Sequence, residues 1–296
     1  MFAPINYNRY NYNINLDTQV TKTTKFSLSL MGSIEKTNNV DPAESASDLF
    51  MSVYKFIPIK SIYYSNGNWG EFAGRSPVAV LNSGGYVHNN NNTLLTNIAV
   101  EQQLPFIKGL SIKGLFSYDP NQRTIKNWHR PFYFYSQNLN TTPYSYAKEI
   151  SANEGGSPSY TWLSQEYSKN QIFTFQGFVN YHNTFGKHDI TGLFVAESRN
   201  NIYEWFNASR DNFAINIDEL GMGSSAKPDF NNDGSSATGS QIGYVYRFGY
   251  SFNNKYLFEA SGRYDGHYSF APGKRWAYFP AFSAGWRISE ENFMKG

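Results

Sequence analysis

Hydrophobic and polar residues alternate with a period of two along much of this chain. In the stretch 239–252, Ile242, Tyr244, Tyr246, Phe248 and Tyr250 occupy every second position. Successive side chains of a β-strand point to opposite faces of the sheet. The pattern therefore predicts a strand with one aromatic, apolar face, and the positions between carry Gln241, Gly243, Arg247, Gly249 and Ser251.

The same alternation predicts nine strands. Two connections between them are long, 37–91 and 120–168, and a third, 207–238, is a polar loop. A short helix is expected near 47–56, and the asparagine run at 89–92 has the composition of a loop. Most of the predicted strands exceed the roughly 5–6 residues usual in soluble sheets. The nine strands are expected at 7–18, 24–36, 92–103, 109–119, 170–183, 188–206, 239–252, 255–265 and 275–287.

Strand length and aromatic content together favour a bilayer as the solvent for the apolar face. A tilted strand needs about 9–11 residues to cross a membrane, and rings gather at both interfaces of transmembrane barrels, which alternate short periplasmic turns with long outer loops. The predicted fold is all-β, an antiparallel transmembrane β-barrel segment with long extracellular loops. Nine strands cannot close a bacterial barrel, and an open edge in lipid leaves backbone groups unpaired. We therefore expect an incomplete barrel.

Composition narrows the alternatives. The chain has 296 residues, 40% of them hydrophobic and 18% aromatic, without the run of about 18 apolar residues that a transmembrane helix needs. The net charge is +2, and the longest basic cluster is 274–275, which argues against nucleic acid as a partner. Cysteine is absent, so thiol nucleophiles and disulfides are excluded. The first residues lack the apolar segment of a secretory signal, and we expect that Met1 does not begin the natural chain.

Few residues suggest chemistry. The five histidines have no metal-ligand spacing, and no nucleophile motif is present, so no enzyme activity is expected. Asp229, Asn231 and Asp233 resemble the opening of a calcium loop with Gly234 at its sixth position, but Ser240 stands where a bidentate glutamate belongs. These residues are a weak calcium candidate, and the alternative is an ordinary turn rich in asparagine and aspartate.

Aromatic residues of the long connections are the candidates for contact with a substrate. Their rings can stack on sugars or peptide side chains, and the alternative is that they pack the loops together or sit in the interfacial belt. The candidates are Trp69, Trp128, Tyr133, Tyr135, Tyr160 and Trp162.

The stretch 256–293 resembles the SusC/RagA family of TonB-dependent outer-membrane transporters. The family pattern is a strand, an Arg-x-Asp-Gly loop, Arg-Trp, Phe-Pro, Ser-x-Gly-Trp and Ile-Ser-Glu-Glu-x-Phe. The chain departs from it at His267, Tyr268 and Ala277, in or beside a loop. The matching residues are Arg263, Asp265, Gly266, Phe270, Arg275, Trp276, Phe279, Pro280, Ser283, Gly285, Trp286, Ile288, Ser289, Glu290, Glu291 and Phe293.

The resemblance implies a function and an organisation. Residues 1–296 would form part of a single transporter barrel in the cell outer membrane, with the signal sequence, plug and closing strands absent. The whole protein would import nutrient oligomers, glycans or peptides, with energy from TonB delivered through the missing N-terminal part. A lipoprotein lid of SusD type would contact the excursions 37–91 and 120–168. Two other classes stay open: a soluble β-rich carbohydrate-binding or adhesin module, and an outer-membrane enzyme with a site at the barrel rim.

The barrel interpretation makes a prediction about side-chain direction. One face should be polar along its height, since a plugged lumen is wet, and the opposite face of 239–287, a three-stranded meander, should carry Tyr244, Tyr246, Phe248, Phe258 and Trp286. The residues expected on the polar face are Asn11, Asn13, Asn15, Glu101, Lys113, Gln176, Glu197, Arg247, Glu259 and Arg263.

Overall fold

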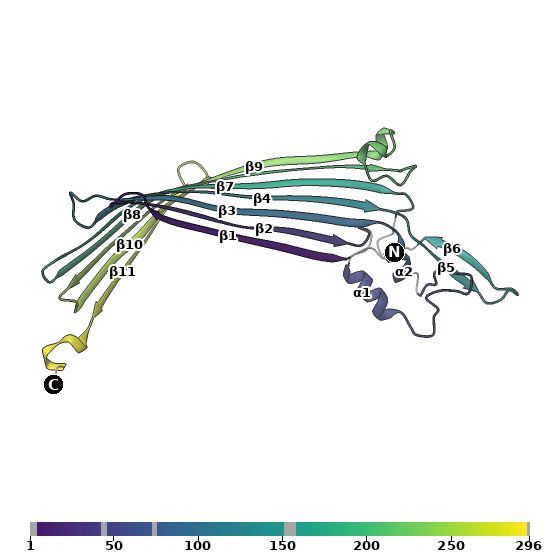
Figure 1. Ribbon diagram of the computed structural model, residues 1–296, viewed down its shortest axis with the longest axis horizontal. Coiled ribbons are helices and arrows are strands. Elements are labelled where there is room, and N and C mark those ends of the chain that lie inside the picture. Colours follow the sequence, from purple (N-terminus) through teal and green to yellow (C-terminus); the bar gives the residue numbers. More distant parts are fainter. Residues whose placement is uncertain (1–4, 43–45, 73–75, 151–157, 295–296) are drawn as a thin grey trace.

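The computed structural model describes residues 5–42, 46–72, 76–150 and 158–294. Its main element is one antiparallel sheet of nine strands that follow one another in chain order, joined on one side by short turns (Figure 1). The strands are β1 (Asn6–Gln19), β2 (Thr24–Asn39), β3 (Tyr86–Gln103), β4 (Leu110–His129), β7 (Trp162–Phe185), β8 (His188–Asp211), β9 (Phe230–Phe252), β10 (Tyr256–His267) and β11 (Trp276–Trp286).

The remaining elements lie in the long connections. Helices α1 (Ala46–Lys55) and α2 (Pro77–Asn82) follow β2, and the hairpin of β5 (Tyr133–Asn138) and β6 (Ser145–Ile150) follows β4. Both groups sit at the same end of the sheet (Figure 1). Short 3-10 turns cover 220–222, 227–229, 288–290 and 292–294. In the part of the chain that the structure describes, no helix is long and apolar enough to cross a membrane.

All nine predicted strands are confirmed, but several are longer than expected. The asparagine run 89–92, predicted as a loop, belongs to β3, and the predicted loop 207–238 is reduced to 212–229. The asparagines are strand residues because their side chains bond across the sheet: Arg123 donates to Asn89 at 3.1 Å, and Asn121 donates to Asn91 at 2.9 Å. Such cross-strand partners override the weak strand propensity of asparagine.

The pairing register confirms the predicted faces. Direct partners in an antiparallel pair share a face, and a row of partners runs from Val100 through Gly114, Gly177 and Ala196 to Tyr244. Following such rows from strand to strand puts all ten predicted polar residues on one side. The five aromatic residues predicted for the opposite face of the meander β9–β10–β11 lie on the other side. Its first turn places Asn253 and Asn254 at φ of 50° and 55°, as a type I′ turn requires, and the Lys255 N–H donates to the Phe252 carbonyl at 2.9 Å.

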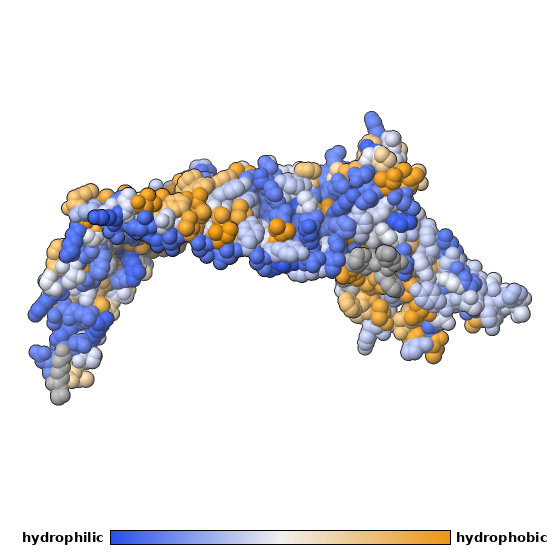
Figure 2. Space-filling view, viewed as in Figure 1, coloured by the Kyte–Doolittle hydropathy of each residue, from blue (hydrophilic) through white to orange (hydrophobic). Residues whose placement is uncertain are grey.

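The outward face is apolar over only part of its height. On β4 the outward residues from Leu110 to Tyr118 are apolar, and those from Gln122 to Lys126 are polar. The apolar stretch of about nine residues matches a tilted membrane span, so the rest of these long strands stands in water on the side of the long connections. In Figure 2 apolar colours gather over the part of the sheet away from the β5–β6 hairpin, and again near α1.

The sheet is an open wall. Within the described ranges, β1 pairs only with β2 and β11 only with β10. This agrees with the expected incomplete barrel, because a closed barrel has no unpaired edge.

Aromatic rings cover several glycines on the outward face. Tyr246 lies over its direct partner Gly262, and a Cβ built on Gly262 would overlap the Tyr246 hydroxyl and lie 2.9 Å from a backbone oxygen. Tyr12 covers Gly32 in the same way, and Trp276 covers Gly266. These rings replace the missing side chains and pack against the strand backbone.

We expect Gly262→Ala to lower the free energy of unfolding by about 1–3 kcal/mol, the usual cost of overpacking a filled site. Gly177→Ala on the same face should cause no loss, because nothing lies within 4 Å of its added Cβ. Urea unfolding of the full-length protein in lipid vesicles measures both. Equal losses would show that the rings do not pack on the glycines.

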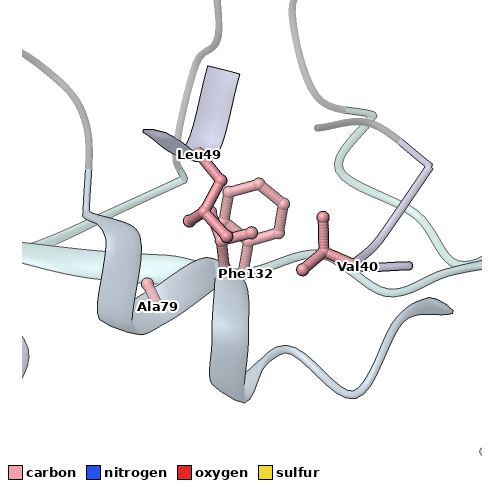
Figure 3. Close-up of a cluster of buried hydrophobic side chains, with 5 residues drawn as sticks. Val40, Leu49, Ala79 and Phe132 are labelled. Atoms are coloured by element: carbon pink, nitrogen blue, oxygen red, sulfur yellow. The ribbon is translucent and has the colours of Figure 1, made fainter. Parts of the chain in front are cut away.

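A small hydrophobic core holds the first long connection against the end of the wall. Val40 at the end of β2, Leu49 of α1, Ala79 of α2 and Phe132 before β5 are all buried and pack together (Figure 3). Trp69 packs against this cluster. The two long connections, predicted at 37–91 and 120–168 and reduced to 40–85 and 130–161 by the longer strands, are therefore joined to each other and to the rim of the wall.

Candidate functional site: the lumen face and its rim

Charged residues of β8 and β10 form a connected network on the inward face. Arg263 reaches across β9 to Glu197, 3.9 Å away, and also contacts Asp265 at 3.0 Å. Gly243 lies between these acids as the direct partner of both. Its lack of a side chain makes room, since an added Cβ would lie 2.7 Å from the Asp265 carboxylate.

The inward face of β1 to β4 bears mostly uncharged polar side chains. The Asn121 amide donates to Asn91 and to Thr93 at 2.8 Å, and the Ser29 hydroxyl donates to Asn15 at 2.7 Å. Amide and hydroxyl groups both donate and accept hydrogen bonds. This half of the wall can therefore bind neutral polar groups, whereas the β7–β10 half presents paired charges.

A buried ion-pairing contact fastens the rim. The His129 ring and the Asp41 carboxylate are both fully buried, with Nδ1 and Oδ1 2.6 Å apart. The second ring nitrogen lies 3.1 Å from the Pro158 carbonyl oxygen. Because a carbonyl oxygen can only accept, that nitrogen carries a proton. Asp41 also accepts from the backbone N–H of Arg130 at 2.9 Å, so the pair joins the end of β2 to the end of β4.

The six candidate aromatic residues have different surroundings. Trp128 belongs to β4 and Trp162 to β7, so these two lie in strands and not in the long connections as predicted. Trp128 is only 3% exposed and packs edge-on against Phe213, and Trp162 stacks on the ring of His129. The backbone of Trp69 accepts a bond from Tyr135, which joins the first excursion to the β5–β6 hairpin. Tyr133 lies under the ammonium of Lys148, 4.0 Å away. Tyr160 is 40% exposed at the rim.

The connection after β8 folds back over the outward side above the apolar band. Asp218 accepts bonds from Lys126 at 2.8 Å and from the Tyr86 hydroxyl. Burial, together with the bond to Asp218, raises the pKa of Tyr86 well above its usual range. The bonds from Lys126 and Tyr86 hold the pKa of Asp218 below its usual range. This contact therefore lies on the outward side of the wall and does not enter the lumen.

The calcium candidates do not lie in a loop as expected. Asp229 ends a 3-10 turn, and Asn231 and Asp233 belong to β9, where Asn207 and Ser209 of β8 are their partners. Strand pairing holds these residues extended. Among the described residues no three acidic or histidine side chains are grouped to hold a metal ion. Calcium binding here stays a prediction.

Glu291 has a structural role that the sequence did not reveal. Its carboxylate accepts bonds from the Tyr256 hydroxyl at 2.7 Å, the Trp286 indole at 3.2 Å and the Lys255 ammonium at 3.2 Å. The bonds from Tyr256, then Trp286 and Lys255, lower the pKa of Glu291. The residue ties the end of the β10–β11 hairpin, and the signal for it was the Ile-Ser-Glu-Glu-x-Phe motif.

Curated TonB-dependent receptors match parts of this chain in sequence. No family model matches the chain. A TonB-dependent receptor of Formosa agariphila is 38% identical over 131 residues, which are 43% of this chain and 12% of that protein. The TonB-dependent receptor SusC of Bacteroides thetaiotaomicron is 44% identical over 54 residues, 18% of this chain and 5% of SusC. The resemblance to SusC/RagA TonB-dependent receptors is confirmed. The chain is accordingly located in the outer membrane.

Solved structures show the same fold. The structure of the RagAB peptide transporter superposes with a TM-score of 0.75 at 16% identity, covering 99% of this chain and 31% of that one. RagAB in its 'open-open' state gives a TM-score of 0.72. A second TonB-dependent receptor of F. agariphila is 22% identical and aligns with 98% of this chain. The chain spans less than a third of the length of each of these proteins.

Proposed function

We propose that this chain is part of the barrel of a TonB-dependent transporter that imports nutrient oligomers, glycans or peptides, across the outer membrane. The observation that carries the proposal is the two-sided wall. Its outward face is apolar over one membrane thickness, and its inward face carries hydrogen-bonded polar side chains and paired charges, with apolar residues such as Leu115 and Leu193 between them. A barrel with such a wall lets a polar solute cross the membrane through its interior without touching lipid.

The SusC-like relatives support the TonB dependence of the whole protein. Passage of an oligomer would then be driven from the periplasm through an N-terminal segment and a plug, with residues 1–296 forming one part of the barrel domain. The relatives are named receptors and transporters, which agrees with a chain that is not an enzyme.

A lipoprotein lid of SusD type is the proposed partner of the rim. The long connections 40–85 and 130–161 stand together at one end of the wall, fixed by the core around Phe132. Near α1 large apolar side chains are exposed, among them Phe50, Tyr54 and Ile59. Exposed apolar surface of this kind marks protein interfaces, so it supports a partner above the barrel.

The alternative of a soluble module requires a second sheet against the aromatic face. Within the described residues the only other sheet is the two-stranded β5–β6 hairpin, which lies at the rim. The exposed rings of Phe248, Phe258 and Phe282 are instead those expected against lipid.

Uptake by living cells tests the proposal. Cells that carry the full-length protein should accumulate a labelled oligosaccharide or peptide mixture, and the same cells without TonB should not. TonB-independent accumulation, or none of either class, would contradict transport of nutrient oligomers. The class that is taken up identifies the substrate.

Tyr160 is the one exposed ring among the six candidates, so we expect it to contact that substrate. We expect Tyr160→Ala to raise the half-saturating concentration for uptake about fivefold, the value of roughly one aromatic stacking contact. Tyr144→Ala, also exposed in this excursion but outside the candidate set, is the control and should leave uptake unchanged. Equal effects would show that Tyr160 makes no specific contact.

A further inference from the structure

A hollow of about 690 Å³ opens on the outward face of the wall, in the middle of the apolar band. Its floor is a row of three direct partners on neighbouring strands: Gly114 of β4, Gly177 of β7 and Ala196 of β8. Val100 and Tyr244 stand at the two ends of this row. The volume lies within the range of about 300–1,000 Å³ typical of ligand sites.

The two glycines of the floor differ from other glycines on the same face. Gly32, Gly262 and Gly266 are covered by the ring of their cross-strand partner, whereas Gly114 and Gly177 face each other and an added Cβ on either would meet nothing within 4 Å. The backbone of two strands is therefore bare at this point. A side chain added at either glycine would begin in open space.

The walls of the hollow are apolar. Phe116 and Phe175, whose ring centroids are 4.7 Å apart, form one side together with Ile98. The nearest charged residue of the lining, Glu197, points to the lumen because it is the neighbour of outward-facing Ala196. A ligand here would meet hydrocarbon and aromatic surface, with hydroxyl groups only at Ser198 and Tyr244.

We propose that this hollow, the acyl groove, binds a segment of the acyl chain of a membrane lipid. Over three strands this row lacks side chains larger than a methyl group, which leaves a trough. The trough is about 7 Å wide, the rise of two residues along a strand, and about 10 Å long, the distance across three strands. A helix with its side chains is about 10–12 Å across and cannot enter. A single hydrocarbon chain fits, and the outer-membrane location places lipid against this face. The inference does not depend on the proposed transport.

Lipid retention by the full-length protein tests the acyl groove. The purified receptor in detergent is titrated with dipalmitoyl phosphatidylethanolamine, and native mass spectrometry counts the bound lipids. The double variant Gly114→Leu/Gly177→Leu fills the trough and should lower occupancy by the first lipid roughly threefold or more, because the dispersion contacts of the trough are lost. Ala284→Leu, an exposed position on the same face of β11, should retain the lipid.

The outcomes are decisive in either direction. Equal occupancy in the filled variant and the parent protein overturns the proposal. The hollow could instead bind a second copy of the protein. If the parent protein forms dimers and the filled variant loses them yet keeps its lipid, the proposal is also overturned. The shift of mobility on heating in gel electrophoresis reports folding, and if the double variant does not fold, the single Gly177→Leu variant decides in its place. Uptake should be unchanged in all these variants.

Discussion

Asp41→Ala is expected to detach the rim connections from the wall while the membrane-spanning part stays folded. The variant leaves the His129 ring and the backbone N–H of Arg130 without the buried carboxylate that both contact. Breaking a buried pair by removing one partner costs about 3–5 kcal/mol. The loss should appear as faster hydrogen exchange in 37–42 and 129–132, measured by mass spectrometry on the full-length protein in detergent.

Asp17→Ala is the matched control. Asp17 pairs with Lys25 at 3.4 Å on the inward face near a short turn, and both side chains are largely exposed. Exposed pairs contribute little, so exchange at the rim should not change. If the Asp41 variant keeps the parent's protection at the rim, the buried pair does not hold the excursions in place.

Leu30→Arg should lower the free energy of unfolding in lipid vesicles by about 2–4 kcal/mol, the cost of an arginine at the bilayer midplane of a barrel. Leu30 lies on the outward face of β2, between its partners Ile14 and Thr96. It is the middle one of the five outward positions from Phe26 to Ile34. Urea titration followed by intrinsic fluorescence measures the change.

Ser29→Arg, one residue away, provides the comparison. Ser29 faces the lumen between Asn15 and Asn97, where water and amide groups can solvate a guanidinium. The loss should be a small fraction of that for Leu30→Arg. Equal losses at both positions would mean that the two faces of β2 meet the same solvent, which contradicts a barrel wall.

The sequence predicted the wall because polar and apolar side chains alternate clearly in several of its strands, most of all in β9. A register with one face in lipid is strongly specified, so Tyr246 and Arg247 could be assigned to opposite faces from the pattern alone. The upper parts of the strands were missed. There both faces are in water, so neighbouring residues such as Asn89 and Asn90 do not differ in polarity. Only the cross-strand bonds in the structure identify this segment as a strand.

The side-chain contacts at the rim could not be predicted from the sequence to the same extent. Trp128 and Tyr160 both fall in the predicted connection 120–168 and look alike in the sequence. Trp128 nevertheless belongs to β4 and is buried under Phe213, whereas Tyr160 is exposed. The buried pair of Asp41 and His129 joins positions 88 residues apart. No local pattern reports such a contact, because it follows from how the ends of β2 and β4 meet in the folded sheet.

Each strand of the wall has one face in lipid and one in the lumen, and cysteine scanning along β9 distinguishes these two faces. The chain contains no cysteine, so single cysteines can be placed at 242–251 in the full-length receptor, freed of any other cysteine, in outer-membrane vesicles. A water-soluble maleimide should label the odd-numbered positions, which share the face of Arg247, and leave the even-numbered ones unlabelled. Labelling without this two-residue period, or labelling of the even positions alone, would contradict the barrel wall.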